Sequence, residues 1–330
     1  MSTRPSSSCA GPPEGGSRLD RPVVVVGSLN LDLVVNPERA PAAGETVFAP
    51  RLDQFPGGKG ANQAVAAARL SAPVAMIGRV GQDAFGERLL ESLRADGVAT
   101  EGVSRSHTAG TGTAVITVDA TGQNRIVVVP GANAEVTPEL VEAHGPLIAS
   151  AAALLLQLEV PVEACVRAAE LAAAAGVPVI LDPAPAPAEP LPEPLRRNTW
   201  LITPNETEAA ALTGVPVAGR CGAEEAARVL WAQGFRQVLI KLGGEGAYLF
   251  RGGAGQWFEP FRVPVVDTTA AGDAFAGGLA AALHRGMALE EAVRWGMAAG
   301  ALAVTRPGAQ PAMGNLDELM TLLRTGRLDA

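Results

Sequence analysis

Short runs that are apolar at every position recur along the chain, and longer alanine-rich stretches with helical spacing separate many of them. An unbroken apolar run is typical of a strand that is buried on both faces of a sheet. From these runs we predict six central strands, over Val23–Gly27, Ala75–Gly78, Leu154–Leu158, Val177–Leu181, Trp200–Ile202 and Val238–Ile240.

The stretches between the apolar runs have the spacing of helices that pack one face against a sheet. Strands that alternate with such helices indicate βαβ units, in which the strands are parallel. We therefore expect an α/β protein with a mostly parallel central sheet and helices on both faces. The predicted helices are Ala61–Leu70, Phe85–Ala95, Pro138–Ala149, Val162–Ala175, Ala223–Gln233 and Ala274–Leu283.

Two regions depart from this alternation. Leu31–Asp53 and Gly112–Val129 contain short segments of alternating polar and apolar residues, which are typical of antiparallel strands outside the main sheet. We expect them to form a small lid beside the carboxyl ends of the parallel strands, where α/β proteins bind ligands. Pro183–Pro194 fits a loop after a strand. Residues 1–20 are rich in Ser, Pro and Gly, and we expect a disordered tail ahead of one domain over residues 21–330.

The composition narrows the class of protein. The 330 residues are 48% hydrophobic, enough for a large core, and the formal net charge of −8 argues against a binder of nucleic acid or anionic membranes. No apolar run reaches the length of a membrane span. Cys9, Cys165 and Cys221 form neither a zinc pattern nor a disulfide framework. We expect a cytoplasmic protein with no nucleic-acid or membrane partner, in which Cys165 is a buried thiol.

The segment Asp267–Asp273 places two carboxylates around a tight turn of small residues, and a helix follows it. In such a turn the backbone N–H groups converge on one point, which the positive end of the helix dipole also faces. A nest of this kind attracts a phosphoryl group, and Asp273 beside it has the chemistry to take a proton from an attacking hydroxyl. These are the parts needed for phosphoryl transfer to an alcohol. The alternative is that the aspartate merely caps the helix.

Three further segments indicate a site for a small polar ligand. Asn30 and Asp32 follow the first strand and offer the donors and acceptors that a polyol needs, although both residue types are also ordinary turn formers. Phe55–Gln63 combines glycines with Lys59 at the start of a helix; it is not a Walker A loop, and a plain turn is the alternative. Glu159 ends a strand, either to accept bonds from hydroxyl groups and orient Lys59 or as a solvated strand end.

Three loops have the chemistry for nucleotide and cation binding. Asn205 and Glu208 share one face at the start of a helix in the spacing of a capping box, and Glu208 also has the chemistry to hold a magnesium-bound water. Lys241–Gly246 places glycines after a strand, which suits either close approach of phosphates or a hairpin turn. Arg306–Pro311 follows an apolar helix; its carbonyl groups suit a cation, and an ordinary turn is the alternative.

Together these motifs resemble the ribokinase-type, or phosphofructokinase-B-type, sugar kinases. The similarity runs from about Pro22 to Ala312, with Gly57–Ala64 matching the amino-terminal signature and Asp267–Phe275 the carboxyl-terminal one. The resemblance implies a ribokinase-like three-layer sandwich with a β lid. It also implies transfer of a phosphoryl group from Mg²⁺-ATP to the 5-hydroxyl of D-ribose, activation by K⁺, and a homodimer formed through the lid.

The resemblance also implies a role for each matching residue. Asp273 is expected to be the general base, and the anion hole is expected from the N–H groups of Ala270, Ala271 and Gly272. The sugar is expected on Asn30, Asp32, Gly58, Lys59, Gly60, Ala61, Asn62 and Glu159. The nucleotide is expected on Asn205, Lys241, Leu242, Gly243, Gly244, Glu245, Gly246 and Met297, together with Gly272 and Asp273. Glu208 is expected to hold Mg²⁺ through water, and the K⁺ ligands are expected among Asp267, Thr269, Ala303, Arg306, Gly308 and Ala312.

Three positions depart from the family pattern and concern nucleotide contacts. Lys241 stands where Thr is common, Asp182 where Asn is common, and Met297 where a polar residue often faces adenine. The nearest rival interpretation is a kinase for deoxyribose, fructose or a nucleoside. A non-catalytic sugar sensor is disfavoured because Asp273 and the anion-hole turn are retained. A dinucleotide-dependent dehydrogenase is disfavoured because Gly27–Asn30 lacks the glycine-rich turn.

Overall fold

The structure is a computed structural model, and it describes residues 18–121 and 123–328. Most of the predicted amino-terminal tail, including Cys9, lies outside the described residues. The last three residues of that tail form a short 3-10 helix, η1 (Arg18–Asp20), where the sequence predicted disordered chain. The side chain of Arg21 then ties the start of the domain to the carbonyl groups of Ser150 and Ala151, at 3.0 and 2.7 Å.

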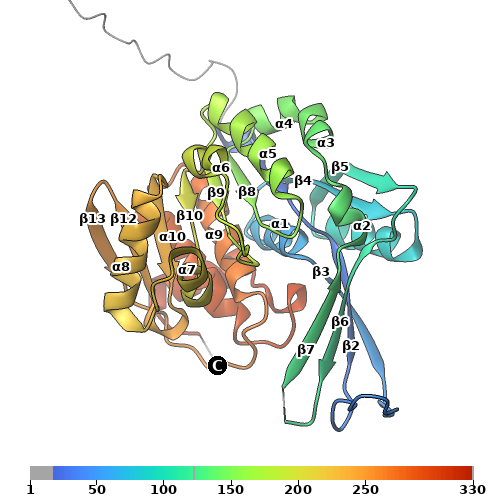
Figure 1. The fold of residues 1–330 in the computed structure, drawn as a ribbon. Helices are drawn as coiled ribbons and strands as arrows, with labels where there is room; N and C mark the ends of the chain where they lie inside the picture. The colour runs from blue at the N-terminus through green and yellow to red at the C-terminus, as the bar shows by residue number, and fades with distance from the viewer. Residues whose placement is uncertain (1–17, 122, 329–330) are drawn as a thin grey trace, which may run out of the picture.

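A nine-stranded sheet forms the middle layer, in the order β13-β12-β11-β10-β9-β8-β1-β4-β5 (Figure 1). Neighbouring strands are parallel from β11 to β5, and β12 and β13 extend one edge as antiparallel strands. All six predicted strands are confirmed as interior strands. The strands are β1 (Val23–Val26), β4 (Val74–Gly81), β5 (Val98–Ser106), β8 (Ala153–Leu156), β9 (Val179–Leu181), β10 (Leu201–Ile202), β11 (Gln237–Lys241), β12 (Ala247–Arg251) and β13 (Ala254–Phe258).

Helices cover both faces of the sheet, as predicted. Val23 and Val25 of β1 belong to the core under α1, α2, α9, α10 and α11, whereas Val24 and Val26 belong to the core under the other helices. Within the described part of the chain, none of the helices has the length and apolar character of a membrane span. The helices are α1 (Lys59–Arg69), α2 (Ala84–Ala95), α3 (Pro138–Ala143), α4 (Gly145–Ala149), α5 (Val162–Ala174), α6 (Glu193–Asn198), α7 (Glu206–Thr213), α8 (Gly219–Ala232), α9 (Ala271–His284), α10 (Leu289–Ala303) and α11 (Leu316–Thr325).

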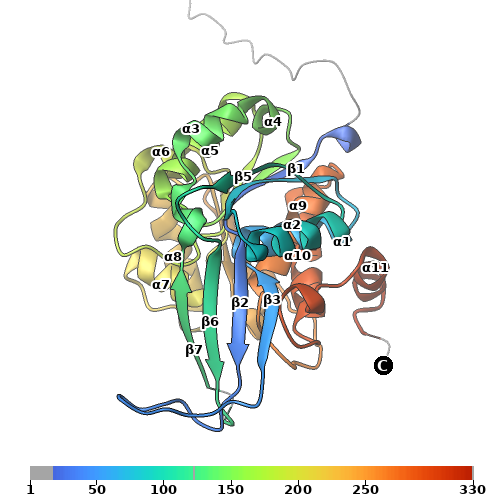
Figure 2. The same cartoon turned by 90° about the vertical axis from the view of Figure 1, so that its right-hand side faces the viewer.

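A second sheet, in the order β3-β2-β6-β7, forms the lid and projects away from the main sheet (Figures 1 and 2). Its strands are β2 (Asn30–Val35), β3 (Leu52–Gly57), β6 (Gly112–Val118) and β7 (Asn124–Val129). The prediction of antiparallel strands is confirmed for β2–β3 and β6–β7, but it is wrong for the middle pair, because β2 and β6 are parallel. The reason is that β2 and β6 follow β1 and β5, which themselves run in the same direction.

Two local predictions need correction. The predicted helix over Pro138–Ala149 is broken at His144, because Pro146 has no N–H to donate to the carbonyl group four residues earlier, which a continuous helix would require. The interpretation of Asn30 and Asp32 as turn residues is also wrong, since both lie in strand β2. This strand carries their side chains from the carboxyl end of β1 to the junction between the two sheets.

Helices α1 and α9 approach each other closely beneath this junction. A Cβ atom added at Gly277 of α9 would lie 2.5 Å from Cβ of Ala66 and 2.9 Å from the carbonyl oxygen of Gln63, both in α1. Only a glycine allows this separation without moving one of the two helices. The amino-terminal turns of the two helices are therefore held side by side at the carboxyl end of the sheet.

Candidate active site

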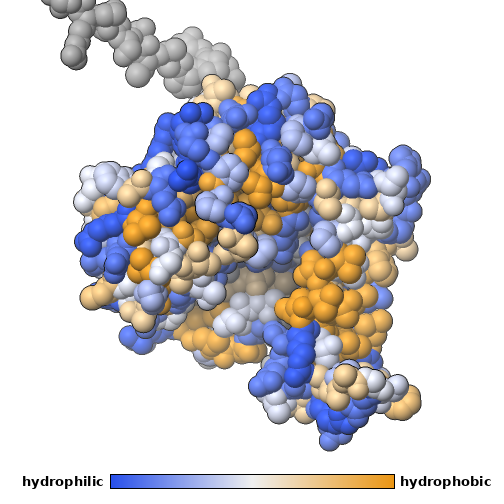
Figure 3. All heavy atoms as spheres, in the orientation of Figure 1, coloured by the Kyte–Doolittle hydropathy of each residue, from blue (hydrophilic) through white to orange (hydrophobic). Residues whose placement is uncertain are grey.

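The predicted site residues converge where the lid meets the main sheet. They come from β2, from the first turns of α1 and α9, and from the loops that follow β8, β10 and β11. The molecular surface is hollowed between the main body and the lid (Figure 3). A cavity of about 740 Å³ is lined by Lys59, Asn205, Lys241 and residues 270–273. Residues far apart in the chain thus line one cavity.

The start of α9 is unusual in its backbone. Ala270, the residue before the helix, is left-handed, with φ 55° and ψ 16°. This conformation costs a non-glycine residue roughly 1–2 kcal/mol, and strain that persists points to a functional constraint. The N–H of Ala271 donates to the carbonyl of Thr268 at 3.3 Å, which closes the turn. Asp273 lies inside the first helical turn and is buried, so the interpretation of this aspartate as a helix cap is wrong.

Both carboxylate oxygens of Asp273 are held by side chains of α1. Asn62 donates to Oδ2 at 2.9 Å and Gln63 donates to Oδ1 at 3.2 Å. Burial raises the pKa of Asp273 to about 6, Lys59 opposes that rise, and the charge of Asp182 adds to it. A buried carboxylate with a pKa near neutrality has the proton affinity of a general base.

Buried amides extend this arrangement beyond the residues that the sequence predicted. Gln63 also donates to Asp182 at 3.0 Å and accepts from Gln157 at 2.6 Å, while Gln310 donates to Asn62 at 3.1 Å. Gln63 and Gln157 stand next to predicted site residues in the sequence, and that proximity was the available signal. Nothing in the sequence places Gln310, which is distant in the chain, against helix α1.

The predicted sugar side gathers carboxylates around Lys59. Glu159 accepts from the hydroxyl of Ser28 at 2.6 Å and from the backbone N–H of Lys59 at 3.0 Å, so it fixes the start of α1 and is not a solvated strand end. Burial raises the pKa of Asp32 to about 7, and the charges of Glu159 and Asp273 add to the rise. Burial alone would lower the pKa of Lys59, but the surrounding carboxylates outweigh it and hold that pKa above its usual value.

The backbone completes this side of the site. Gly58, at φ 88°, lies where a Cβ would meet the backbone N of Asn30 at 2.7 Å. The N–H groups of Gly60 and Ala61 donate to Ser28, at 3.4 and 3.0 Å. The side chain of Asn30 accepts from Asn133 at 2.7 Å, a contact that no pattern in the sequence indicates. Gly60 and Ala61 therefore lie at the predicted place but bond to the protein's own backbone and hydroxyl group.

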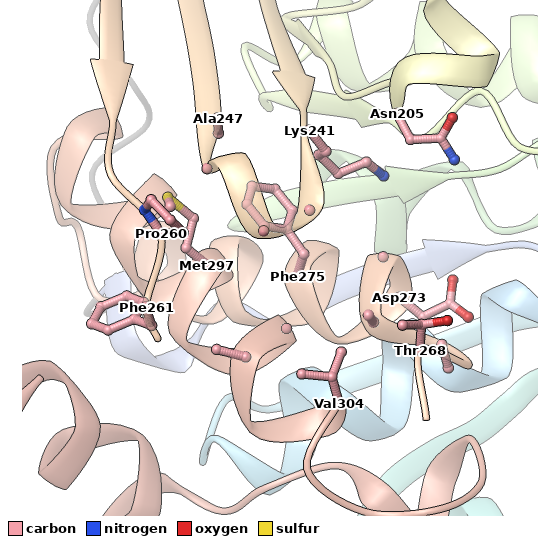
Figure 4. Close-up of a pocket in the computed structure, with 18 of the residues that line it drawn as sticks. Asn205, Lys241, Ala247, Pro260, Phe261, Thr268, Asp273, Phe275, Met297 and Val304 are labelled. Atoms are coloured by element: carbon pink, nitrogen blue, oxygen red, sulfur yellow. The ribbon is translucent and has the colours of Figure 1, made fainter. Parts of the chain in front are cut away.

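The predicted nucleotide side lies across the cavity. Asn205 and Glu208 form the predicted capping box at the start of α7, with both reciprocal bonds at 2.8 Å. Lys241–Gly246 is both a hairpin turn between β11 and β12 and a wall of the cavity, although Leu242 is buried and Glu245 is not among the lining residues. Figure 4 shows Lys241 reaching toward the part of the pocket that Asn205 and Asp273 border. The apolar lining includes Phe261, Val263, Val265, Phe275, Met297, Ala301 and Val304.

The residues predicted for a monovalent cation lie on two adjoining loops. Asp267 accepts from the N–H and hydroxyl groups of Thr269 at 2.9 and 2.7 Å, and from the N–H of Gly308 at 2.8 Å. Burial alone would raise the pKa of Asp267, but these donors outweigh it and hold that pKa below its usual value. The guanidinium of Arg306 pairs with Glu318, so Arg306 offers the loop its backbone carbonyl. The other two predicted ligands are the buried residues Ala303 and Ala312.

Comparison with known proteins decides the class of enzyme. The model of the pfkB family carbohydrate kinases matches residues 20–315. The chain belongs to this family. A ribokinase of Haemophilus influenzae is 40% identical over 301 residues, which are 91% of this chain and 98% of that protein. A deoxyribokinase of Salmonella typhi is 34% identical over 91% of this chain and 99% of its own length.

The solved structures lead to the same class. The structure of Arabidopsis thaliana ribokinase complexed with ribose and ATP has a TM-score of 0.87 and 38% identity, and the match covers 92% of this chain and 99% of that one. The predicted three-layer α/β fold with a lid is therefore confirmed, and this pfkB family member is an ATP-dependent sugar kinase. The roles of individual residues, the two cations and the homodimer stay predictions.

Proposed function

We propose that this kinase transfers the terminal phosphoryl group of ATP to the 5-hydroxyl of D-ribose, giving D-ribose 5-phosphate and ADP. The observation that carries the proposal is the position of Asp273. Its carboxylate is buried at the first turn of α9, bonded to α1 on the sugar side and bordering the cavity on the nucleotide side. The ribokinases of Haemophilus influenzae and Arabidopsis thaliana, at 40% and 38% identity over most of the chain, support ribose as the sugar.

In this proposal the sugar lies between the lid and α1. Asp32, Asn30 and Lys59 bind its hydroxyl groups, and Glu159 keeps Lys59 in place through the backbone bond described above. Asp273 takes the proton of the 5-hydroxyl as the oxygen attacks phosphorus. The first turn of α9 stabilises the charge on the transferring group by its N–H groups and dipole. The lid excludes water, which limits hydrolysis of ATP.

The nucleotide occupies the 740 Å³ cavity in this proposal. The apolar wall around Met297 and Phe261 suits the flat face of adenine, and the glycines after β11 let the backbone approach the phosphates. In this proposal the triphosphate lies next to Asn205 and the start of α9, which both line the cavity. Its terminal phosphoryl group would then face the hydroxyl that Asp273 activates.

The donor groups fit the two cations that the family implies. Glu208 brings a carboxylate to the cavity wall, where Mg²⁺ bound to the phosphates would neutralise charge and Glu208 would act through water. In the described ranges, no cluster of three His, Cys, Asp or Glu residues has the geometry of a metal site. A K⁺ ion would therefore rely on Asp267 and on backbone carbonyls of the loops around Thr269 and Gly308, a flexible oxygen set suited to a large ion.

We also propose a cytoplasmic homodimer, with a tail over residues 1–20 and one kinase domain over residues 21–330. Strand β7 is an edge of the lid sheet, and Ile126, Val127, Val128 and Val129 are all about half exposed or more. An apolar edge strand of this kind invites pairing with another strand. Figure 3 shows apolar residues gathered over the lid. Pairing of two lids would cover them.

A panel of sugars tests the proposed substrate. ADP release would be followed by a coupled assay with D-ribose, 2-deoxy-D-ribose, D-fructose and adenosine, each over a range of concentrations. We expect kcat/KM to be highest for D-ribose. The second candidate is deoxyribose, favoured by the 34% identity to a deoxyribokinase, and a higher kcat/KM for 2-deoxy-D-ribose would replace the proposal by that candidate. An adenosine preference would assign a nucleoside kinase.

A further inference from the structure

The chain contains two lysines, Lys59 and Lys241, among 26 basic residues, and every other basic side chain is an arginine. Both lysines line the same cavity. Lys59 belongs to the glycine-rich motif at the start of α1, whereas Lys241 belongs to the loop on the nucleotide side, and its ammonium group has been given no role so far. A chain that uses arginine elsewhere carries lysine at this position, whose ammonium group is a compact point charge on a flexible stem.

The ammonium group of Lys241 lies beside the start of α9. A Cβ atom added at Gly272 would lie 3.4 Å from Nζ of Lys241, so Nζ is directly against the turn that precedes the helix. The side chain is 13% exposed and borders the cavity. A phosphoryl group that is attacked by a hydroxyl bonded to Asp273 must pass this same turn. The positive charge of Lys241 is therefore next to the path of phosphoryl transfer.

Asp182 holds that ammonium group in place. Oδ1 of Asp182 accepts from Nζ of Lys241 at 2.8 Å, and Oδ2 accepts from Gln63 at 3.0 Å. Asp182 is 3% exposed, so its carboxylate cannot turn toward solvent. The same Gln63 amide donates to Asp273 at 3.2 Å. Two hydrogen bonds donated by this one amide thus connect Asp182, the partner of Lys241, with the proposed base.

The pair does not have the character of a structural ion pair. Burying two charges costs several kcal/mol of desolvation, and an apolar pair of the same size often stabilises a fold as well or better. An ammonium group has three donors, and Asp182 takes one of them. Because the side chain borders the cavity, the remaining donors are within reach of a ligand there.

We propose that Lys241 binds the terminal phosphoryl group of the nucleotide and that Asp182 is the positioning residue that aims it. This inference rests on the proposed kinase function and adds a phosphate ligand to the helix turn of Ala270–Gly272. The ammonium group bonds to Asp182 in the free enzyme and shares its donors with the phosphoryl oxygens when ATP is bound. It then offsets negative charge at the transferring group.

Nuclear magnetic resonance of lysine side chains tests the contact directly, because two lysines give two resolved signals. The protein would be labelled with lysine carrying ¹³C at Cε, and Lys241→Met would assign the signals by removing one. We expect the Lys241 signal to move on addition of the non-hydrolysed analogue AMP-PNP with Mg²⁺, and to move several-fold less with AMP. A Lys241 signal that responds equally to AMP and AMP-PNP, or to neither, overturns the proposal.

Calorimetry of variants tests the energetic role. Lys241→Met should weaken AMP-PNP binding by about ten- to a hundredfold, the value of a charge-assisted hydrogen bond, and change AMP binding by less than about threefold. Arg236→Met is the matched control, because it removes the same charge from an exposed position just before β11. Two results would contradict a specific phosphoryl contact. One is that Lys241→Met loses as much affinity for AMP as for AMP-PNP. The other is that Arg236→Met loses as much affinity for AMP-PNP as Lys241→Met does.

The role of Asp182 is tested by a double-mutant cycle with Asp182→Asn, which keeps the shape of the side chain and removes its charge. If Asp182 aims Lys241, the AMP-PNP penalty of Lys241→Met should be several-fold smaller in the Asp182→Asn background. The same variant should raise KM for ATP while leaving KM for ribose nearly unchanged. A full penalty in both backgrounds would remove Asp182 from the proposal.

The outcomes separate this inference from the proposed function. If the Lys241 effects are observed but the protein phosphorylates another sugar, the inference about Lys241 stands and ribose is not the substrate. If the protein makes D-ribose 5-phosphate but Lys241→Met binds AMP-PNP as tightly as the wild type does, the proposed function stands and the inference about Lys241 is wrong. If the wild-type protein binds neither AMP-PNP nor AMP, the proposed function and the inference about Lys241 are both wrong.

Discussion

At the scale of single residues, the site depends on carboxylates whose proton affinity is set by their surroundings. Burial raises the pKa of Asp273 to about 6 and that of Asp32 to about 7, in each case above the ordinary value for aspartate. In the proposed function each group must be ionised to act, Asp273 as a base and Asp32 as an acceptor for sugar hydroxyls. The proton therefore competes with the substrate at mildly acidic pH.

This competition predicts a particular pH profile. At saturating ATP, kcat/KM for ribose should begin to fall below about pH 7 and fall more steeply below about pH 6, because first Asp32 and then Asp273 is protonated. Asp32→Asn should lower kcat/KM but leave one step, near pH 6. The profile would be measured by initial rates in constant-ionic-strength buffers. A flat profile from pH 5 to 8 would show that neither carboxylate has a shifted pKa.

At the scale of elements, the close approach of α1 and α9 sets the geometry of the base. Gln63 and Asn62, which hold Asp273, lie on the turn of α1 nearest to Gly277. Any side chain at Gly277 meets backbone atoms of α1, since a Cβ there would lie 2.8 Å from the N of Ala67. A change in the spacing of the two helices would therefore move the side chains that hold Asp273.

Gly277→Ala should destabilise the protein by roughly 1–3 kcal/mol, as overpacking of a core does, and it should lower kcat more than KM because α1 carries Asn62 and Gln63 away from Asp273. Thermal unfolding and steady-state kinetics would measure both effects. Gly145→Ala is the control, since a Cβ at Gly145 meets its nearest neighbour at 3.8 Å. Equal unfolding temperatures for the two variants would contradict the account of helix spacing.

The two loops joined by Asp267 predict activation by a monovalent cation. K⁺ should raise kcat above the value in Na⁺ at matched ionic strength, because a cation between the loops would brace the turn at Ala270 and fix the N–H groups that face the phosphoryl group. Asp267→Ala should lose this preference. Initial rates in K⁺, Na⁺ and Tris buffers measure it, and equal wild-type rates in all three would refute the idea.

Local patterns in the sequence predicted these elements well, but they did not predict contacts between residues that are distant in the chain. Val23–Val26 and Val238–Ile240 read as buried strands because every position is apolar, and both are. The spacing of apolar residues over Pro138–Ala149 is helical throughout and does not show the break at His144. The bond of Gln310 to Asn62 joins residues whose separation in the chain gives no periodic signal. The segment around Asp273 and the position of Asn62 were therefore predictable, and the contact of Gln310 was not.

At the scale of the whole molecule, the lid ends in an edge strand that is apolar on both faces. Val127 and Val129 point to one side of β7, and Ile126 and Val128 to the other, and all four are exposed. The sequence predicted the lid but not the parallel β2–β6 pair, because the direction of a strand depends on the sheet from which it emerges. The exposed edge is the feature that favours a second copy of the chain as partner.

Val127→Lys should weaken the proposed dimer at least tenfold, because a buried, unpaired charge opposes pairing of the two lids. Sedimentation velocity over a range of concentrations would measure the dissociation constant. Met320→Lys, at an exposed position of α11 on the main body, is the control and should leave it unchanged. A wild-type protein that stays monomeric at high concentration, or a Val127→Lys dimer of unaltered affinity, would rule out the lid interface.

The central claim is that Asp273 is the base for phosphoryl transfer to ribose. Its most direct test is the identity and rate of the product: D-ribose and Mg²⁺-ATP are incubated with the enzyme, and the phosphorylated sugar is assigned by ³¹P resonance and mass. We predict D-ribose 5-phosphate with the wild-type enzyme, and a rate lower by about 10²–10⁴ with Asp273→Asn while ribose binding is retained. Absence of a sugar phosphate with the wild-type enzyme, or a wild-type rate with folded Asp273→Asn, would contradict the account.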